Sequence, residues 1–426
     1  MNDKQSIREV RPSGPLNAVV RVPGSKSYTQ RALVAAALAE GRSILHNTLH
    51  SEDTLYLSLA LQDLGAEIRQ EGDCLIVQGT GGRIRNPGRD IFVGNNGTAM
   101  RFLASLVCLG AGTFVLTGGP RLCERPMGPL LENLTRMGAE CRFLGRKGCA
   151  PFEIRASSLS GGRAVFEEVE SSQFISSLLL AAPYAREEVT IEVRGPVLSR
   201  PYVDMTLSVM EKFGVEVRED PPNRLTVPCG RPYQGRRYGI EADGSSASYF
   251  FLAAALCGGA VRVEDLPAGC QGDLGFLEIL EKAGCTVIRN GGSIEVRGGS
   301  LRPGENIIPM GHMPDMVPSV AALSACRPGR TVIDGVPHLR YKESDRLSAL
   351  STELRKTGVW VRELQDGLII EGGGPRGAEI ETYDDHRIAM SFAVLGLAAP
   401  GMRVRDPACV GKSFPDFWER LEGLYR

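Results

Sequence analysis

Residues 26–41 read KSYTQRALVAAALAEG, a polar helix start followed by an alanine-rich apolar run, and this pattern decides the fold. Each similar run follows polar or charged residues and has the spacing of a helix built from small apolar side chains. Five further runs follow at intervals of about 72 residues, near Thr98, Ser172, Ser245, Met316 and His386. Self-similarity at a fixed interval indicates that one supersecondary unit is repeated six times.

A second pattern runs in phase with the first. An amphipathic helix ends at a glycine suited to a helix C-terminus, and a short strand carrying an arginine, a turn and another strand follow. The five glycines are Gly65, Gly138, Gly214, Gly284 and Gly358. Strands are also expected before the alanine-rich helices, at residues 18–22, 90–94, 163–167, 237–241, 306–310 and 378–382. The predicted unit is therefore βαβαββ, which makes the protein an α/β (α+β) protein.

Six units divide into three and three. A polar stretch, CGRPYQGRRYG (residues 229–239), marks a break between them, and the sixth unit lacks its own hairpin. Residues 7–11 are predicted to close that unit, which would bring both termini into one domain. We therefore expect one discontinuous domain of residues 1–20 plus 241–426, and one inserted domain of residues 21–240.

Composition excludes several classes of protein. The chain has 426 residues, a formal net charge of −1, 42% hydrophobic residues and 6% aromatic residues, which argues against disorder and nucleic-acid binding. Apolar stretches fall short of the roughly 18 residues of a membrane helix, and the N-terminus does not resemble a signal peptide. The 11 cysteines show no C-x-x-C pair and indicate reduced thiols. We expect a cytoplasmic monomer that binds neither nucleic acid nor membrane.

Cations and hydroxyls gather at the starts of the alanine-rich helices. In PGSKSYTQR (residues 23–31), Lys26 and Arg31 add positive charge to a helix start, where free amides and the helix dipole favour anions. The spacing is not that of a Walker loop, and an ordinary capped helix is the alternative. GNNGTAMR (94–101), ERPMGPL (124–130), ESSQF (170–174) and LSRPY (198–202) repeat the theme. Each of these, taken alone, is also explained by a turn or a cap.

The second half of the chain adds acids and bases. Asp315 precedes the fifth helix, where capping is the usual role of an aspartate. RYKESDR (340–346) would commonly be a solvated run of charges. DDHRIAM (384–390) contains one histidine without a second ligand at helical spacing, which argues against a metal site. GKSFPDFW (411–418) adds Lys412.

The position of these residues within the repeat favours function over the alternatives. The charged residues fall in loops at helix starts, and equivalent ends of repeated units are expected to point the same way. They are Lys26, Arg125, Asp315, Lys342, Arg346, Arg387 and Lys412. We expect two domains that face each other across one cationic cleft, which would bind small anionic substrates.

Taken together, these motifs resemble the 5-enolpyruvylshikimate-3-phosphate synthase family of enolpyruvyl transferases over essentially the whole chain. PGSKSYTQR, GNNGTAMR, ERPMGPL, SSQF, LSRPY, MPDMVP, YKESDR, DDHR and KSFPDF occur in the family's order. The resemblance implies two domains, each of three βαβαββ repeats in an inverse α/β barrel, with the active site in the cleft between them. It also implies transfer of the enolpyruvyl group of phosphoenolpyruvate to the 5-hydroxyl of shikimate 3-phosphate, without metal or organic cofactor.

The same resemblance implies the ligand-binding residues. Shikimate 3-phosphate would be held by Lys26, Ser27, Arg31, Ser171, Ser172, Gln173, Ser199, Tyr202, Asp315, His338 and Lys342. Phosphoenolpyruvate would be held by Lys26, Gly97, Arg125, Gln173, Arg346, Arg387 and Lys412. Asp315, Glu343 and Lys26 would be the catalytic residues: Asp315 takes the hydroxyl proton and Glu343 moves a proton at C3 of the enolpyruvyl group.

Three residues depart from the family's usual pattern. His338 stands where the family usually has asparagine beside the substrate. Asn96 stands where alanine is usual, and Phe102 stands where proline is common. The latter two lie near the expected enolpyruvate site, so they bear on sensitivity to glyphosate, which competes with phosphoenolpyruvate in this family.

Two other functions are compatible with parts of the pattern. The first is that of the sister family, the UDP-N-acetylglucosamine enolpyruvyltransferases, which usually carries a reactive cysteine before its Arg-Pro. Cys123 is too close to Arg125 for that spacing, and the KESDR and DDHR motifs are of the shikimate type. The second is a non-catalytic sensor of phosphorylated metabolites, against which the retained Asp315 and Glu343 argue, since binding alone needs neither.

Overall fold

The computed structural model describes residues 6–167, 171–195, 197, 199–267 and 269–425. The chain forms two compact units. The inserted unit is Gly24–Ile240, and the terminal unit is Met1–Pro23 together with Glu241–Arg426. The boundary expected after residue 20 lies after Pro23, because strand β2 (Leu16–Arg21) continues to Arg21, which pairs with Glu264 of the terminal unit.

Each sheet of the inserted unit has four strands in the same arrangement. An outer strand runs parallel to its neighbour, and the two strands of a hairpin complete the sheet in antiparallel register. The first sheet is β14 (Arg237–Gly239), β3 (Arg42–His46), β5 (Cys74–Gln78) and β4 (Glu67–Glu71). The second is β6 (Ile91–Phe92), β7 (Gly112–Thr117), β9 (Phe152–Ala156) and β8 (Glu140–Phe143). The third is β10 (Gly162–Phe166), β11 (Val189–Val193), β13 (Arg224–Val227) and β12 (Arg218–Asp220).

The terminal unit repeats this arrangement twice and then varies it. Its first sheet is β2, β15 (Gly259–Glu264), β17 (Ser293–Arg297) and β16 (Thr286–Asn290). Its second is β18 (Gly304–Pro309), β19 (Gly329–Asp334), β21 (Leu368–Gly372) and β20 (Trp360–Glu363). In the third, β22 (Glu379–Ile380) runs parallel to β23 (Arg403–Arg405), and β1 (Ile7–Glu9) pairs antiparallel with β23. The prediction that residues 7–11 close the sixth repeat is thus confirmed for β1.

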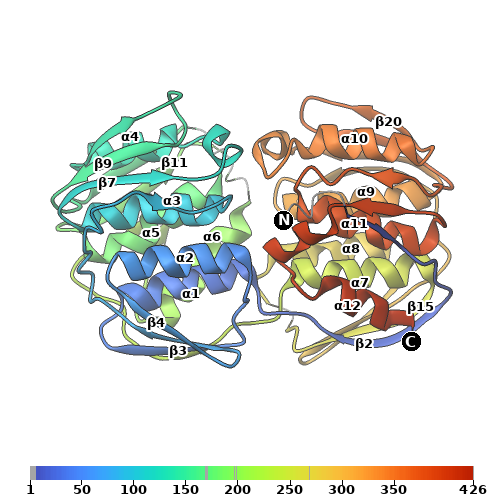
Figure 1. Cartoon of the computed structure of the whole chain (residues 1–426), viewed down its shortest axis with the longest axis horizontal. Helices are drawn as coiled ribbons and strands as arrows, with labels where there is room; N and C mark the ends of the chain where they lie inside the picture. The colour runs from blue at the N-terminus through green and yellow to red at the C-terminus, as the bar shows by residue number, and fades with distance from the viewer. Residues whose placement is uncertain (1–5, 168–170, 196, 198, 268, 426) are drawn as a thin grey trace. The chain divides into compact units, whose positions relative to one another are not determined.

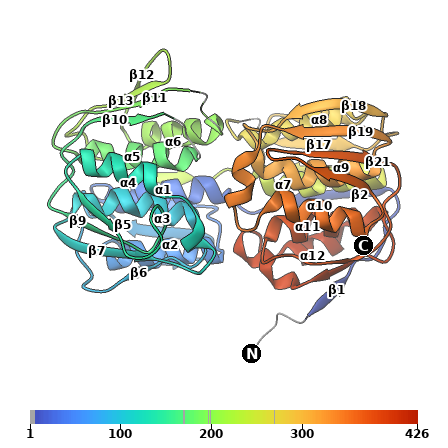
Figure 2. The same cartoon turned by 90° about the horizontal axis from the view of Figure 1, so that it is seen from above.

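The alanine-rich helices form the inside of each unit and the sheets cover them (Figures 1 and 2). In the inserted unit these are α1 (Lys26–Leu38), α3 (Gly97–Leu106) and α5 (Ser172–Ala181), which pack on one another. In the terminal unit they are α7 (Gly244–Cys257), α9 (Val317–Cys326) and α11 (His386–Ala398), which also pack together. Burial on all sides explains why these helices are apolar around their whole circumference.

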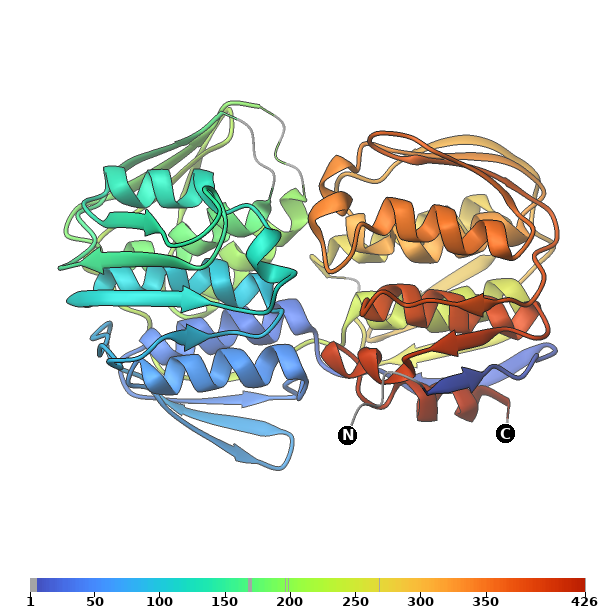
Figure 3. The same cartoon turned by 45° about the horizontal axis from the view of Figure 1, so that its top comes forward.

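The second helix of each repeat is amphipathic and more exposed (Figure 3). These are α2 (Glu52–Asp63), α4 (Gly128–Arg136), α6 (Arg200–Lys212), α8 (Phe276–Lys282), α10 (Arg346–Lys356) and α12 (Phe417–Glu422). The five glycines predicted at helix C-termini all have φ between 87° and 112°, a left-handed conformation that only glycine adopts without strain. Inside α11, a Cβ on Gly396 would lie 2.7 Å from Met402 Cβ, so the small residues permit close packing here.

The first and fourth repeats exchange their opening strands. The sequence predicts a strand before α1 and another before α7, and both exist. However, β2, which precedes α1, pairs with β15 after α7, while β14, which precedes α7, pairs with β3 after α1. The exchange occurs because the chain passes from one unit to the other directly after each of these strands. Among the described residues, no helix has the length and apolarity needed to cross a bilayer.

Candidate active site

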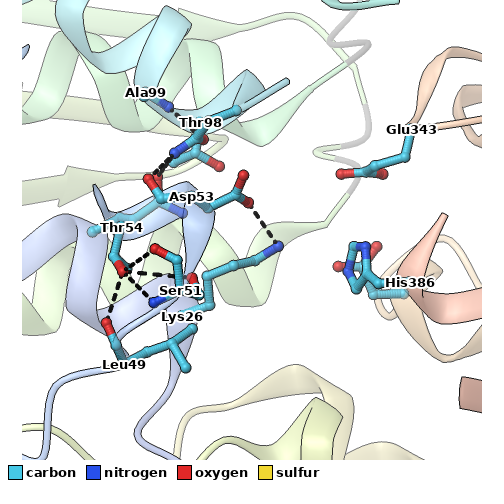
Figure 4. A network of polar contacts seen from close by, with 12 residues as sticks. Lys26, Leu49, Ser51, Asp53, Thr54, Thr98, Ala99, Glu343 and His386 are labelled. Carbon is cyan, nitrogen blue, oxygen red and sulfur yellow. Dashed lines mark hydrogen bonds and ion pairs between the residues drawn. The ribbon is translucent and has the colours of Figure 1, made fainter. Parts of the chain in front are cut away.

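Lys26 is the first residue of α1 and faces a buried carboxylate. The side chain of Ser25 caps the helix by accepting a hydrogen bond from the Tyr28 amide. Lys26 Nζ lies 3.2 Å from Asp53 Oδ2, in the first turn of α2 (Figure 4). The Asp53 side chain is only 6% exposed, so Lys26 is held by a largely desolvated partner. Asp53 was missed by the sequence motifs, because an acid in the first turn of a helix is ordinary.

Asn96 ties three helices together beside this pair. It is the N-cap of α3, where its side chain accepts from the Ala99 amide. Its Nδ2 donates to Gln30 Oε1 on α1 at 2.9 Å and to the Asp53 carbonyl on α2 at 2.6 Å. Asn96 is fully buried. The departure from the usual alanine therefore adds a hydrogen-bonded junction behind Lys26.

Gly97 lies against two arginines at the start of α3. A Cβ there would lie 2.7 Å from Arg125 Nη1 and 2.9 Å from Arg101 Nη1, so a side chain at this position would push the two guanidinium groups away from their present places. Arg101 Nη1 donates to Gln173 Oε1 at 2.6 Å, and Gln173 Nε2 donates to the Thr98 hydroxyl at 3.1 Å. The structure thus brings three predicted residues, Gly97, Arg125 and Gln173, around Arg101. Phe102, the other departure, points into the core and is fully buried.

Arg31 is largely occupied by bonds inside the unit. Its guanidinium donates to Thr206 Oγ1 at 2.7 Å, to the Tyr202 carbonyl at 2.9 Å and to the Ser27 carbonyl at 3.0 Å. Burial lowers the pKa of Arg31 to about 10. These bonds hold α1 against α6 and connect Arg31 to two other predicted residues, Ser27 and Tyr202.

The predicted serines lie at two other helix starts. Ser171 caps α5 by accepting from the Gln173 amide at 3.3 Å, and Ser172 is the first residue of that helix. Ser199 precedes α6 in the left-handed conformation, with φ of 58°, and Tyr202 follows in the first turn. The inserted unit therefore presents amides and hydroxyls at three neighbouring helix starts, those of α1, α5 and α6.

Asp315 is the centre of the terminal-unit cluster. It lies in a 3-10 turn, η6 (Pro314–Met316), just before α9. Its Oδ1 is 2.9 Å from Arg346 Nη1 and 3.5 Å from Lys342 Nζ, and its Oδ2 is 2.8 Å from Arg387 Nη2. Burial alone would raise the pKa of Asp315, but Arg387, Lys342 and Arg346 hold it well below its usual range. The carboxylate is ionised and forms ion pairs with three cations.

Arg346, the first residue of α10, connects three carboxylates. Besides Asp315, its guanidinium bonds Glu343 Oε2 at 2.8 Å and Asp385 Oδ2 at 2.8 Å, and its side chain is only 1% exposed. Burial opposes the charge, yet Asp385, Glu343 and Asp315 raise the pKa of Arg346. Asp385 also caps α11 by accepting from the Arg387 amide. The sequence placed Asp385 in a motif but did not identify it as the residue that holds two predicted ligands.

Arg387 is the second residue of α11 and has further partners on α7. Nη1 donates to Tyr249 Oη and Nη2 to Ser245 Oγ, both at 3.4 Å. Ser245 Oγ in turn donates to Asp273 in the 3-10 turn η5 (Gly272–Gly275). Burial, aided by Asp315, raises the pKa of Asp273 to about 6. Neither Ser245 nor Asp273 was singled out by the sequence for this role.

His338 and Lys412 lie on two further 3-10 turns. His338 is in η7 (Pro337–Tyr341), is 9% exposed, and neither ring nitrogen has a hydrogen-bond partner among the described residues. Burial, together with Lys342, lowers the pKa of His338 to about 4, so the ring is neutral and offers one donor and one acceptor. Lys412 ends η8 (Pro407–Lys412), which packs on α11, and is also buried.

This set of groups is suited to anions and to proton transfer. Buried lysine and arginine side chains at helix starts can neutralise phosphate and carboxylate groups, and ionised carboxylates beside them can accept protons. In the described ranges, no group of three or more His, Cys, Asp or Glu side chains is arranged to hold a metal ion.

Known proteins resemble this chain in both sequence and fold. The family model described as EPSP synthase (3-phosphoshikimate 1-carboxyvinyltransferase) matches residues 10–421. The curated 3-phosphoshikimate 1-carboxyvinyltransferase of Nostoc sp. is 44% identical over 410 residues, 96% of each chain. That of Syntrophobacter fumaroxidans is 44% identical over 421 residues, 98% of this chain and 99% of its own. A solved EPSP synthase from Acinetobacter baumannii superimposes with a TM-score of 0.82 at 30% identity, covering 99% of this chain and 98% of that one. The chain belongs to the EPSP synthase family.

Proposed function

We propose that this chain transfers the enolpyruvyl group of phosphoenolpyruvate to the 5-hydroxyl of shikimate 3-phosphate, releasing phosphate. The observation that carries the proposal is the ionised Asp315 carboxylate held by Lys342, Arg346 and Arg387. Membership of the EPSP synthase family and the two relatives at 44% identity support the same reaction. The product feeds the synthesis of chorismate and aromatic amino acids.

The two ligand sets implied by the motifs remain our proposal for the substrate contacts. The shikimate 3-phosphate set is Lys26, Ser27, Arg31, Ser171, Ser172, Gln173, Ser199, Tyr202, Asp315, His338 and Lys342. The phosphoenolpyruvate set is Lys26, Gly97, Arg125, Gln173, Arg346, Arg387 and Lys412. We also propose that the two units are the domains of a cytoplasmic monomer, each contributing residues to both sets.

We propose that the two arginines control how strong a base Asp315 is. Arg387, Lys342 and Arg346 hold the pKa of Asp315 well below its usual range, and a general base works best with a pKa nearer the working pH. A carboxylate or phosphate that binds Arg346 and Arg387 adds negative charge beside Asp315 and weakens the stabilisation of the Asp315 carboxylate by the two arginines. The pKa of Asp315 then rises, so the base is strengthened when the second substrate arrives.

The reaction balances as an addition followed by an elimination. The 5-hydroxyl oxygen bonds C2 of phosphoenolpyruvate while Asp315 takes the hydroxyl proton and C3 gains a proton. The tetrahedral intermediate then loses one proton of the C3 methyl group as the C2–O bond to phosphate breaks and the double bond re-forms. We assign the transfers at C3 to Glu343, aided by Lys26, and the stabilisation of the phosphate to the cations.

A phosphate-release assay tests this proposal. The protein is incubated with phosphoenolpyruvate and either shikimate 3-phosphate or UDP-N-acetylglucosamine, with and without glyphosate. We expect phosphate release only with shikimate 3-phosphate. Release with UDP-N-acetylglucosamine alone would overturn the proposal in favour of the sister activity, and release with neither acceptor would favour a binding protein without turnover.

A further inference from the structure

A strained turn directly precedes the α11 start that carries Asp385 and Arg387. Tyr383 and Asp384 both have left-handed backbones, with φ of 55° and 56°. Two consecutive non-glycine residues in this region cost free energy, and such a turn persists only where its surroundings hold it. Tyr383 is the costlier of the two, because aspartate tolerates this conformation better than a bulky residue.

A buried glutamate holds this turn from α10. Glu353 is wholly buried, and its two carboxylate oxygens have different partners in the turn. Oε1 accepts from the Tyr383 hydroxyl at 2.7 Å, and Oε2 accepts from the Glu381 amide at 3.0 Å. Lys356 Nζ lies 2.6 Å from Oε2 and balances the buried charge. Hydrogen bonds to an ionised, buried acceptor are the strong kind.

The same helix also presents Arg346. Glu353 follows Arg346 by seven residues, two helical turns, so both lie on one face of α10. That face is bonded to the α11 start at two points: Arg346 to Asp385, and Glu353 to the turn that precedes Asp385. Two bonded segments, α10 and residues 381–387, therefore fix the positions of Arg346 and Arg387, the two arginines proposed to hold phosphoenolpyruvate. We call these two segments the frame.

We propose that Glu353 and Tyr383 are positioning residues for phosphoenolpyruvate: they hold the strained turn and thereby fix Arg387 and Asp385 against Arg346. The proposal rests on the proposed function for the identity of the ligand. Neither residue is placed in contact with substrate. Small displacements of the Arg346 and Arg387 guanidinium groups would cause large losses in substrate binding and in rate. The frame therefore affects the reaction although Glu353 and Tyr383 do not contact the substrate.

The test compares Tyr383→Phe and Glu353→Gln with wild type and with Tyr425→Phe. The last variant removes a tyrosine hydroxyl elsewhere in the same unit. In Glu353→Gln, the side chain could still accept from the Glu381 amide and donate to the Tyr383 hydroxyl oxygen, but it loses the negative charge that pairs with Lys356 and strengthens both bonds. Steady-state kinetics give the KM for each substrate, calorimetry gives the affinity for shikimate 3-phosphate alone, and hydrogen exchange reports on peptides that cover residues 379–390.

We expect Tyr383→Phe to raise the KM for phosphoenolpyruvate about three- to tenfold, less than the full free energy of a charge-assisted hydrogen bond, because the hydroxyl acts on Arg387 only through the turn. We expect Glu353→Gln to raise this KM further. The affinity for shikimate 3-phosphate alone should stay within about twofold, and faster exchange should be confined to residues 379–390. An unchanged KM for phosphoenolpyruvate overturns the inference. So does a parallel loss of affinity for shikimate 3-phosphate with faster exchange throughout the terminal unit, since that pattern is general destabilisation.

The failure of the proposed function would look different. A wild-type protein that releases no phosphate from the two substrates contradicts the proposed function. Hydrogen exchange then still decides the positioning role: faster exchange confined to residues 379–390 in both variants supports the frame, and exchange equal to that of wild type refutes it.

Discussion

Asp315→Asn removes one negative charge from the terminal-unit cluster and leaves its shape almost unchanged. Asparagine keeps a carbonyl acceptor for Arg346 or Arg387 but cannot take a proton from a hydroxyl at neutral pH. The carboxylate it replaces lies 2.9 Å from Arg346 and 2.8 Å from Arg387, with Lys342 at 3.5 Å. The substitution therefore separates proton transfer from positioning better than a truncation to alanine.

Two losses follow from this geometry. A hydrogen bond to a charged group contributes about 1.5–3 kcal/mol, and the asparagine NH2 group cannot accept one, so losing the bond to one of the two arginines costs about 1.5–3 kcal/mol of folding stability. The Asp315 side chain is 17% exposed, so solvent screens this interaction only partly. Loss of a general base costs about 100- to 10,000-fold in kcat.

The assay measures phosphate release, shikimate 3-phosphate affinity and urea unfolding on the variant. Asp416→Asn is the matched control, since Asp416 makes an exposed ion pair with Arg420 in the same unit. We expect kcat to fall at least about 100-fold for Asp315→Asn while the affinity for shikimate 3-phosphate stays measurable and Asp416→Asn stays near wild type. A kcat within about threefold of wild type would remove Asp315 from the role of base.

The pH dependence of stability gives an independent check. The pKa of Asp315 is depressed in the folded protein, so its ionised form stabilises the fold above its unfolded pKa of about 3.9. That contribution is lost as the pH falls from about 4 through the folded pKa. The stability gap between wild type and Asp315→Asn should therefore be constant above about pH 7, where Asp273 is ionised in both proteins. It should change near pH 6, because Asp315 helps to raise the pKa of Asp273, and should narrow below about pH 4 as Asp315 is protonated.

Three further substitutions test other parts of the site. Gly97→Ala places a Cβ 2.7 Å from Arg125 Nη1, so we expect the KM for phosphoenolpyruvate to rise about tenfold or more while that for shikimate 3-phosphate stays within about twofold in steady-state assays. Asn96→Ala removes a cap and two buried bonds, and urea unfolding should show a loss of about 2–3 kcal/mol with kcat within about threefold of wild type. His338→Leu keeps the volume but not the polar nitrogens; the KM for shikimate 3-phosphate should rise about five- to twentyfold, and an unchanged KM would take His338 out of the substrate site.

The repeat explains why the sequence predicted so much of the fold. Six copies of one pattern average out local ambiguity, and the strands, helices and capping glycines all lie close to the expected positions. The exchange of β2 and β14 was not predicted, because both strands carry the pattern expected of an opening strand. Which sheet an opening strand joins depends on contacts between residues about 190 or more positions apart in the chain, and a local pattern contains no information about them.

The candidate site also contains residues that the sequence predicted and residues that it did not. Motifs located the cations at helix starts because the cations recur at the same position of the repeat, although each motif alone is also explained by an ordinary cap. They did not find Asp53, Glu353 or the role of Asp385. Each of these acids occupies a position where acids are common, at a helix N-terminus or on a charged helix face, so only the three-dimensional partners identify them.

The net charge of −1 does not show that the cations of the candidate site are themselves paired with carboxylates. Lys26 is paired with Asp53 in the inserted unit, and Arg346 and Arg387 share Asp315 in the terminal unit, so under the proposed function an incoming anion meets cations that already have carboxylate partners. Binding energy then comes from an exchange of partners, because the anion replaces part of the interaction between Asp315 and its arginines. Under the proposed mechanism, the carboxylate displaced in this way becomes the stronger base, so binding of the second substrate also activates the base. A neutral residue in place of Asp315 would leave the two arginines freer to bind an anion, but it could not accept the hydroxyl proton.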